Sequence, residues 1–233
     1  MVLCLRKQRH GLTSRVLCPG ASWVSVWGRK PGSQELTLYS VVAMDNKTMP
    51  DLEKLGTVTT LVVPCAFHTA DIAAYKERYP SAKVVCSTAD REAVEKLVSV
   101  GGVTEEEFAA DKAESTGITA LWPRGLKSNE PVLALEVAGG AVALLFCDLL
   151  MNLDPKSESF KGRIFGMVGG TMTPIRVSRI VRKFIVSDKK AVKGFLSGLV
   201  KDVGRPIAAI GVCHGQPETE GCEEKIAAAA QRL

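Results

Sequence analysis

The sequence has few of the features that mark special classes of protein. No apolar run in its 233 residues approaches the roughly 20 residues needed to cross a bilayer, so no membrane segment is predicted. Its seven cysteines are odd in number and include no CxxC pair, which argues against a disulfide framework and against a zinc–cysteine cluster. Most of them end apolar runs, as the reduced and buried cysteines of intracellular proteins do.

Acidic residues are absent from the first 34 positions, which carry six basic residues. An acid-poor, basic N-terminus is typical of an organelle presequence. Residues 16–27 look instead like strand material, which confines a leader to residues 1–12 and leaves a single domain over residues 13–233. We therefore expect a cytoplasmic protein, with a mitochondrial or other organellar location as the alternative.

The chain does contain an intermixed series of predicted strands and helices. Hairpins are predicted over residues 21–42 and 131–147, and consecutive hairpins imply antiparallel pairing. A single doubly wound parallel sheet therefore fits poorly, and an all-helical bundle is excluded. An α/β fold with a two-sheet core and outer helices fits better. The main helices are predicted over residues 50–55, 70–79, 174–184, 187–203 and 218–231.

Three predicted strands end in an ionisable side chain. An apolar run stops at Pro64, and His68 follows in a short turn before a helix for which Thr69 is the expected N-cap. A second apolar run ends at Asp148 and a third at His214. Strand ends are where α/β proteins hold reactive side chains, so these three residues form the candidate site.

The order of these motifs resembles that of the metallo-β-lactamase superfamily. Phe146-Cys147-Asp148 looks like its Gly-Asp element, and Cys213-His214-Gly215 looks like its terminal His-Gly element. His68 lies where the family's first metal-binding cluster belongs. From Leu38 onward the chain looks like a divergent, uncharacterised branch with a degenerate metal site. The resemblance implies an αββα sandwich, with two mixed β-sheets packed face to face and helices outside.

The sequence departs from the family where the metals bind. The His-x-His-x-Asp-His cluster is absent, the family's mid-chain histidine is missing, and the chain has three histidines in all, including His10. A two-metal centre is therefore not expected. His68, Asp148 and His214 could hold at most one divalent metal (zinc, iron or manganese) as catalytic residues and ligands. Such a metal could activate water to cleave an ester, thioester or phosphoester.

Other interpretations of this site stay open. The three residues could be an inherited, hydrogen-bonded remnant that binds no cofactor. A metal-free base could be formed by His68 with Asp71 or Asp148. Because neighbouring strand residues face opposite sides, Cys147 and Cys213 are expected to point into the core.

Two further stretches could contact a ligand. In the loop 127–130, Asn129 or Glu130 could replace the missing histidine through an oxygen, although a solvated turn would also explain the loop. The glycine-rich stretch 162–170 has no Lys-Ser/Thr after it, so it is not a P-loop, and we interpret it as a flexible flap near the pocket.

Residues 156–205 carry twelve basic and three acidic side chains. In the predicted helix, Arg176, Arg179 and Lys183 share one side while Ile180, Val181 and Phe184 face the core. A basic face attracts anions, although most such faces are only solvated surface. Few aromatic side chains interleave with the charges, so nucleic acid is not an expected partner. The expected partner is a small, anionic molecule, and its predicted binding residues are Asp71, Asn129, Glu130, Arg176 and Arg179.

The sequence thus predicts a hydrolase-like protein with a reduced metal site. The alternative is a catalytically inactive binding protein of the same fold, which holds an anionic ligand in the pocket or on the basic helices of residues 176–193. The sequence carries no signal for oligomeric state.

Overall fold

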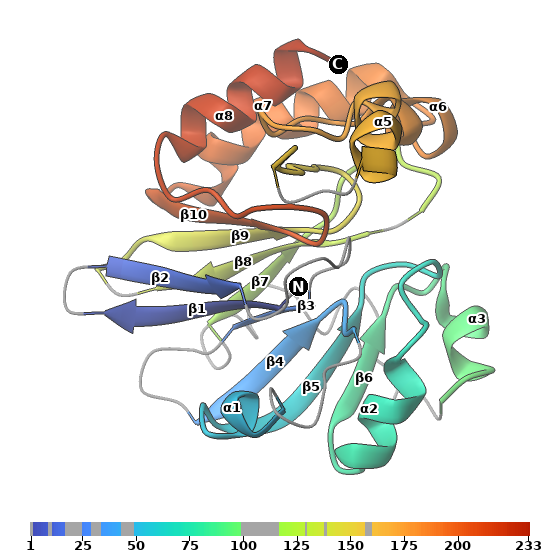
Figure 1. Ribbon diagram of the computed structural model, residues 1–233, viewed down its shortest axis with the longest axis vertical. Coiled ribbons are helices and arrows are strands. Elements are labelled where there is room, and N and C mark those ends of the chain that lie inside the picture. Colours follow the sequence, from blue (N-terminus) through green and yellow to red (C-terminus); the bar gives the residue numbers. More distant parts are fainter. Residues whose placement is uncertain are drawn as a thin grey trace.

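The computed structural model describes residues 2–8, 11–16, 25–28, 34–42, 49–98, 117–128, 130–137, 139–156 and 160–233. Figure 1 shows four layers, with helices outside and two β-sheets between them. This confirms the predicted αββα sandwich of two mixed sheets. In the described part of the chain no helix has the length and apolarity to span a membrane.

The first sheet comes from the N-terminal part of the chain and has the strand order β2-β1-β3-β4-β5-β6. Strands β3 and β4 pair antiparallel, as the predicted hairpin requires, whereas β4, β5 and β6 run parallel to one another. The predicted division of the chain into a leader (residues 1–12) and a single domain (residues 13–233) stays a prediction. The strands are β1 (Val2–Gln8), β2 (Gly11–Val16), β3 (Ser25–Gly28), β4 (Glu35–Tyr39), β5 (Thr57–Val63) and β6 (Lys83–Cys86).

The second sheet has the strand order β10-β9-β8-β7. Strands β8 and β9 form the predicted hairpin, and the C-terminal strand β10 joins the sheet parallel to β9. All five residues of β9 are buried, because the strand is covered on both faces. The strands are β7 (Ile118–Leu121), β8 (Val132–Glu136), β9 (Val142–Phe146) and β10 (Ile207–Val212).

Two groups of helices cover the outer faces of the sheets (Figure 1). The first group packs on the six-stranded sheet and comprises α1 (Met49–Glu53), α2 (Ile72–Arg78) and α3 (Arg91–Glu95). The second group lies over the four-stranded sheet and comprises α5 (Phe160–Gly169), α6 (Arg179–Phe184), α7 (Lys189–Val203) and α8 (Cys222–Gln231). Helix α7 shows how the sequence sets its bounds, because Asp188 accepts bonds from the Lys190 and Ala191 N–H groups and Gly204 ends the helix at φ 62°.

Three predictions about helices are wrong. Helix α2 begins after Asp71, and the hydroxyl of Thr69 donates to the Ala66 carbonyl instead of capping the helix. Helix α6 begins at Arg179, because Arg176 pairs with Met151 in an extended bridge. Residues 160–169 form helix α5, where no helix is predicted, and Gly166 and Gly169 let it approach Met172 and Ile180 closely. The flexibility of the predicted flap stays a prediction.

The interior divides into three hydrophobic clusters, one at each interface between neighbouring layers. One lies between the first helix group and the six-stranded sheet, and another lies between the four-stranded sheet and helices α6–α8. The third lies between the two sheets and includes Tyr39, Leu145, Cys147 and Cys213. Both cysteines therefore point into the core, as predicted.

Candidate metal centre and its cavity

The candidate site forms where strands of both sheets end. His68 lies in the turn between β5 and α2, and its N–H donates to the Cys65 carbonyl at 3.0 Å. Asp148 follows β9 and His214 follows β10, and these parallel neighbours end at the same edge of their sheet. The face-to-face packing of the sheets then brings all three side chains together.

The two imidazoles converge on one oxygen of Asp148. Its Oδ1 lies 3.2 Å from Nε2 of His68 and 2.9 Å from Nε2 of His214. The two rings meet edge to face, with centroids 5.4 Å apart. Each of the three residues is less than a tenth exposed. Burial would raise the pKa of Asp148, but the hydrogen bonds and charges of His214 and His68 outweigh it and hold that pKa well below its usual value.

Ser40 fixes the orientation of His68 from the opposite side of the ring. Its Oγ lies 2.6 Å from Nδ1 of His68, and Ser40 is buried at the end of β4 with a positive φ of 54°. A partner on Nδ1 directs Nε2 toward Asp148, which is how proteins orient a histidine that binds a metal. Sequence reasoning missed Ser40. The signal available in the sequence was a polar residue directly after the strand-forming stretch of residues 35–39, but the pairing of this strand with β5 is seen only in the structure.

Glu130 holds the backbone at Asp148 in place. It is completely buried, and its two carboxylate oxygens accept the N–H groups of Asp148 at 3.2 Å and Leu149 at 2.7 Å. Burial and the charge of Asp148 raise the pKa of Glu130 to about 8, against the lowering effect of these two hydrogen bonds. The interpretation of this loop as a solvated turn is wrong at Glu130, and Asn129 lies outside the described residues. We name Ser40, His68, Glu130, Asp148 and His214 the Asp148 cluster.

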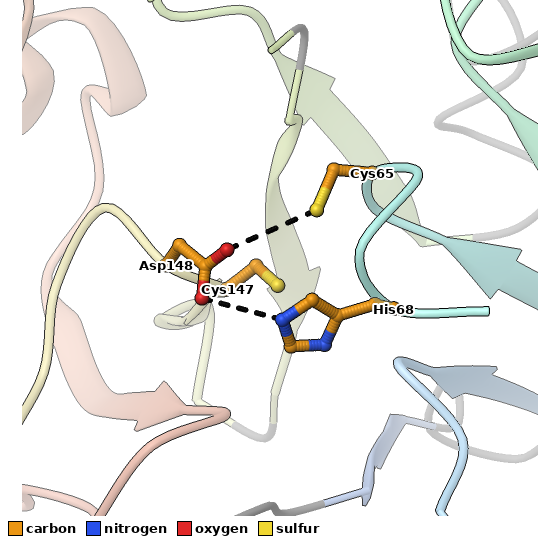
Figure 2. A group of neighbouring side chains, drawn as sticks. All are labelled: Cys65, His68, Cys147 and Asp148. Atoms are coloured by element: carbon orange, nitrogen blue, oxygen red, sulfur yellow. Dashed lines mark hydrogen bonds and ion pairs between the residues drawn. The ribbon is translucent and has the colours of Figure 1, made fainter. Parts of the chain in front are cut away.

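Two thiols lie beside the Asp148 cluster. Figure 2 shows Asp148 with one carboxylate oxygen toward His68 and the other toward Cys65, whose Sγ donates to Oδ2 at 3.9 Å. Single donor atoms of Cys65, His68, Cys147 and Asp148 all lie within 4.8 Å of one another. Burial raises the pKa of the Cys147 thiol well above its usual value. The sequence prediction missed Cys65 as a donor, although it stands three residues before His68 in the same turn.

The two distances from Oδ1 of Asp148 to the histidine nitrogens suit a single metal ion. Two imidazole nitrogens and a carboxylate oxygen are common zinc ligands and leave one position free on a tetrahedral ion. Ligand atoms about 2.0–2.1 Å from a tetrahedral zinc are roughly 3.3 Å apart, which is close to the Nε2–Oδ1 distances of 3.2 and 2.9 Å. Small shifts of these side chains would therefore accommodate an ion.

A cavity of about 820 Å³ opens above Asp148 and His214. Its walls come from the turn that carries His68, from the loop around Lys127, and from helices α5 and α6. Phe67 and Phe184 belong to the lining and are 71% and 60% exposed, so the prediction that Phe184 faces the core is wrong. The lining residues are Ala66, Phe67, Asp90, Lys127, Ser128, Asp148, Met151, Leu153, Gly162, Thr171, Ile180, Val181, Phe184, Ile185 and His214.

The other predicted ligand-binding residues lie away from this lining. Asp71 is half-buried at the start of α2. Arg176 lies outside α6, and its guanidinium donates to the carbonyls of Pro174 and Thr173. Arg179 is exposed on α6. Helix α6 therefore presents apolar side chains to the cavity, including Ile180 and Val181, rather than its arginines.

The comparisons with known proteins identify the fold through structure alone. No family model matches the sequence, and no curated protein matches it. The chain is similar to a metallo-β-lactamase from Erythrobacter litoralis with β-mercaptoethanol in its active site, at 13% identity and a TM-score of 0.57 over 87% of this chain and 82% of that one.

Two more solved structures are similar to the chain. FIM-1 from Pseudomonas aeruginosa, a metallo-β-lactamase in its mono-zinc form, matches at 11% identity and a TM-score of 0.54 over 85% of this chain and 80% of that one. A metallo-β-lactamase from Pontibacter korlensis matches at 12% identity and a TM-score of 0.53 over 99% of this chain and all of that one. At such identities the likeness establishes a shared fold.

Proposed function

We propose that this chain, which has the metallo-β-lactamase fold, is a hydrolase with a single divalent metal held by His68, Asp148 and His214. Its substrates are esters, thioesters or phosphoesters. The observation that carries this proposal is the convergence of two imidazole nitrogens on one buried carboxylate oxygen at the floor of a large cavity. Ligand side chains from three strand ends, oriented by buried partners, are the usual construction of a metal centre.

Zinc is the metal that best suits the surroundings. Imidazole and carboxylate accept zinc, iron and manganese, but thiols favour zinc over manganese. The Cys65 Sγ lies 3.9 Å from the second oxygen of Asp148, so a thiol stands beside the proposed ion without being one of its three ligands. One of the structures with this fold, FIM-1, is in a mono-zinc form, so the fold can hold a single zinc.

The residues of the chain have separate tasks in this proposal. His68, Asp148 and His214 would hold the zinc, which would supply Lewis-acid polarisation of the substrate and make a water acidic enough to attack near neutral pH. Ser40 holds the His68 ring, and Glu130 holds the backbone at Asp148 and Leu149. His68, Asp148 and His214 are each less than a tenth exposed, and this burial strengthens the electrostatic interactions among them. In the reaction, water adds to the carbonyl carbon or phosphorus, the bond to the leaving oxygen or sulfur breaks, and the leaving group takes up a proton.

The metal content of the purified protein tests this proposal. Protein prepared without chelator is expected to contain close to one zinc per chain and to hydrolyse p-nitrophenyl esters or acyl thioesters. Asp148→Asn should lose at least about nine-tenths of the metal, because a neutral amide is a poor ligand. The matched control is Asp202→Asn, since Asp202 is exposed on α7 and lies far from the site in the fold.

One observation favours the alternative, a metal-free binding protein. The hydrogen bonds of His214 and His68 already hold the pKa of Asp148 low, so this carboxylate is stabilised without an ion. Wild-type protein that contains no zinc, iron or manganese and takes up none on dialysis would overturn the metal centre. It would leave the inactive binding protein as the function.

A further inference from the structure

We propose that the cavity binds the apolar acyl chain of an ester or thioester, with the acyl carbonyl at the floor beside Asp148 and His214. The cleavage of that acyl group rests on the proposed function, whereas the binding of the chain does not. The proposal follows from the chemistry of the walls, from one buried hydroxyl and from the two phenyl rings at the surface.

The walls of the cavity are mainly apolar. Eight of its fifteen lining residues carry apolar side chains, and four of these come from one short stretch at α6. A volume of about 820 Å³ lies within the range of roughly 300–1,000 Å³ typical of small-molecule sites. Such walls bind a ligand mainly by removing its hydrocarbon surface from water. The eight are Ala66, Phe67, Met151, Leu153, Ile180, Val181, Phe184 and Ile185.

The charges of the walls do not select an anion. Apart from the site residues, the charged side chains in the lining are Lys127 and Asp90, which have opposite signs. The three arginines of the basic segment, Arg176, Arg179 and Arg182, are not part of the lining. An uncharged, apolar chain therefore suits the interior better than a phosphate or a carboxylate does.

Ser128 is a lining residue whose hydroxyl is covered and faces no open space. Its Oγ has no hydrogen-bond partner among the described residues, whereas the hydroxyl of Thr171, also in the lining, donates to the Gly166 carbonyl. A buried hydroxyl without a partner is costly, so a rotation of the Ser128 side chain toward a ligand oxygen would gain affinity. The carbonyl or the ester oxygen of an acyl group is such an atom, and a plain hydrocarbon lacks one.

Two phenyl rings stand where the cavity meets solvent. Phe67 and Phe184 are both lining residues, yet they are 71% and 60% exposed. They come from different elements, the turn that carries His68 and the end of α6. A hydrocarbon chain that enters between these elements would cover both rings and recover the burial that they lack in the free protein.

Binding of methyl ketones tests the proposal, because these ketones keep the carbonyl and the chain of an acyl ester but cannot be hydrolysed. Their affinities, from hexanone to tetradecanone, are measured calorimetrically on zinc-free and on zinc-loaded protein. Affinity should rise about two- to fourfold per methylene until the cavity is full. Ser128→Ala should weaken ketone binding about three- to tenfold and leave the binding of an alkane of equal length unchanged.

Phe184→Ser should weaken the binding of the longer ketones at least fivefold. Phe160→Ser is the matched control, because Phe160 is 78% exposed on α5 and is not a lining residue. The proposal is overturned if affinity is independent of chain length, if short carboxylates or inorganic phosphate bind more tightly than the ketones, or if both phenylalanine variants behave alike. A protein that takes up no zinc but binds ketones by chain length keeps this inference and loses the proposed function.

Discussion

The Asp148 cluster and the basic segment 176–193 are both rich in ionisable groups, but they are built in opposite ways. Every member of the Asp148 cluster is less than a tenth exposed, and His68 and His214 reach Asp148 across 80 and 66 positions of sequence. The basic segment is continuous in sequence, yet most of its cations, such as Arg179 and Lys193, are exposed. In this protein, the stretch of sequence with the most basic residues therefore forms solvated surface. The ionisable groups that contact one another in the Asp148 cluster come from distant positions in the sequence.

The largest effect is expected from removing the central carboxylate. Asp148→Asn should reduce ester or thioester hydrolysis at least about a hundredfold, since it takes away both a ligand and the partner of two histidines. The double variant Arg179→Glu with Lys183→Glu should change the rate less than about twofold on an uncharged ester. Initial rates at saturating zinc measure both. If both variants lose the same share of the hydrolysis rate, the Asp148 cluster and the basic segment do not differ in their importance for catalysis.

Removing the support of His68 should have the next largest effect. Ser40→Ala should weaken zinc binding about 10- to 100-fold, as the loss of an outer hydrogen bond to a ligand usually does. Competition with a chromogenic chelator measures the affinity. Ser197→Ala, at an exposed position on α7, serves as the control and should leave it unchanged. Unchanged affinity in Ser40→Ala would mean that Ser40 does not orient the ring.

Glu130 provides a test through stability. Glu130→Ala removes the side chain that accepts two buried N–H groups, so it should lower the free energy of unfolding by about 1–3 kcal/mol at pH 5. Urea denaturation of zinc-free protein measures this loss. An unchanged midpoint at pH 5 would contradict the role of Glu130 as the support of the Asp148 backbone.

The same carboxyl predicts a pH dependence. Its pKa is raised from 4.5 to about 8 in the folded protein, so the folded state binds more protons than the unfolded state between these values. The stability that it contributes is complete below about pH 4.5 and is lost as the pH rises toward and beyond 8. Glu130→Gln should flatten the wild-type decline in urea midpoint between about pH 5 and 8. If the urea midpoint declines with equal slope in the wild type and in Glu130→Gln, the decline comes from other titrating groups.

The smallest effect is expected from the basic surface alone. Arg179→Glu should change the free energy of unfolding by no more than about 0.5 kcal/mol, because the side chain is exposed. Thermal unfolding measures this change. A large loss would show that this surface, like the Asp148 cluster, depends on specific contacts.

The sequence predicts the layers and three members of the cluster for an identifiable reason. Apolar strands that stop at a polar residue, as at Asp148 and His214, can be seen in one sequence, and the order of such stops points to the fold. Ser40 could not be found in this way, because its role depends on which strands lie side by side. Glu130 was predicted only as a residue that contacts a ligand, since its contact with the Asp148 backbone depends on how far a loop folds inward. Short polar loops are usually solvated, and that general rule fails for Glu130.

The cavity was equally hidden from the sequence. Periodicity identifies the apolar side of residues 179–185, but it does not distinguish a side that meets the core from one that lines a cavity. Val181, at 1% exposure, belongs to the core and also to the cavity lining, whereas Phe184, at 60% exposure, belongs to the lining alone. The start of α6 was placed too early because the bridge between Arg176 and Met151 joins segments that no local pattern connects.

The position of His68 on one sheet and of Asp148 and His214 on the other has a mechanical consequence. An ion held by all three would join the two sheets at the edge where their strands end, and its binding energy would resist any sliding of one sheet over the other. Loading the centre should therefore make the two halves of the molecule melt as one body. The three side chains that would hold the catalytic ion would then also hold the two sheets together.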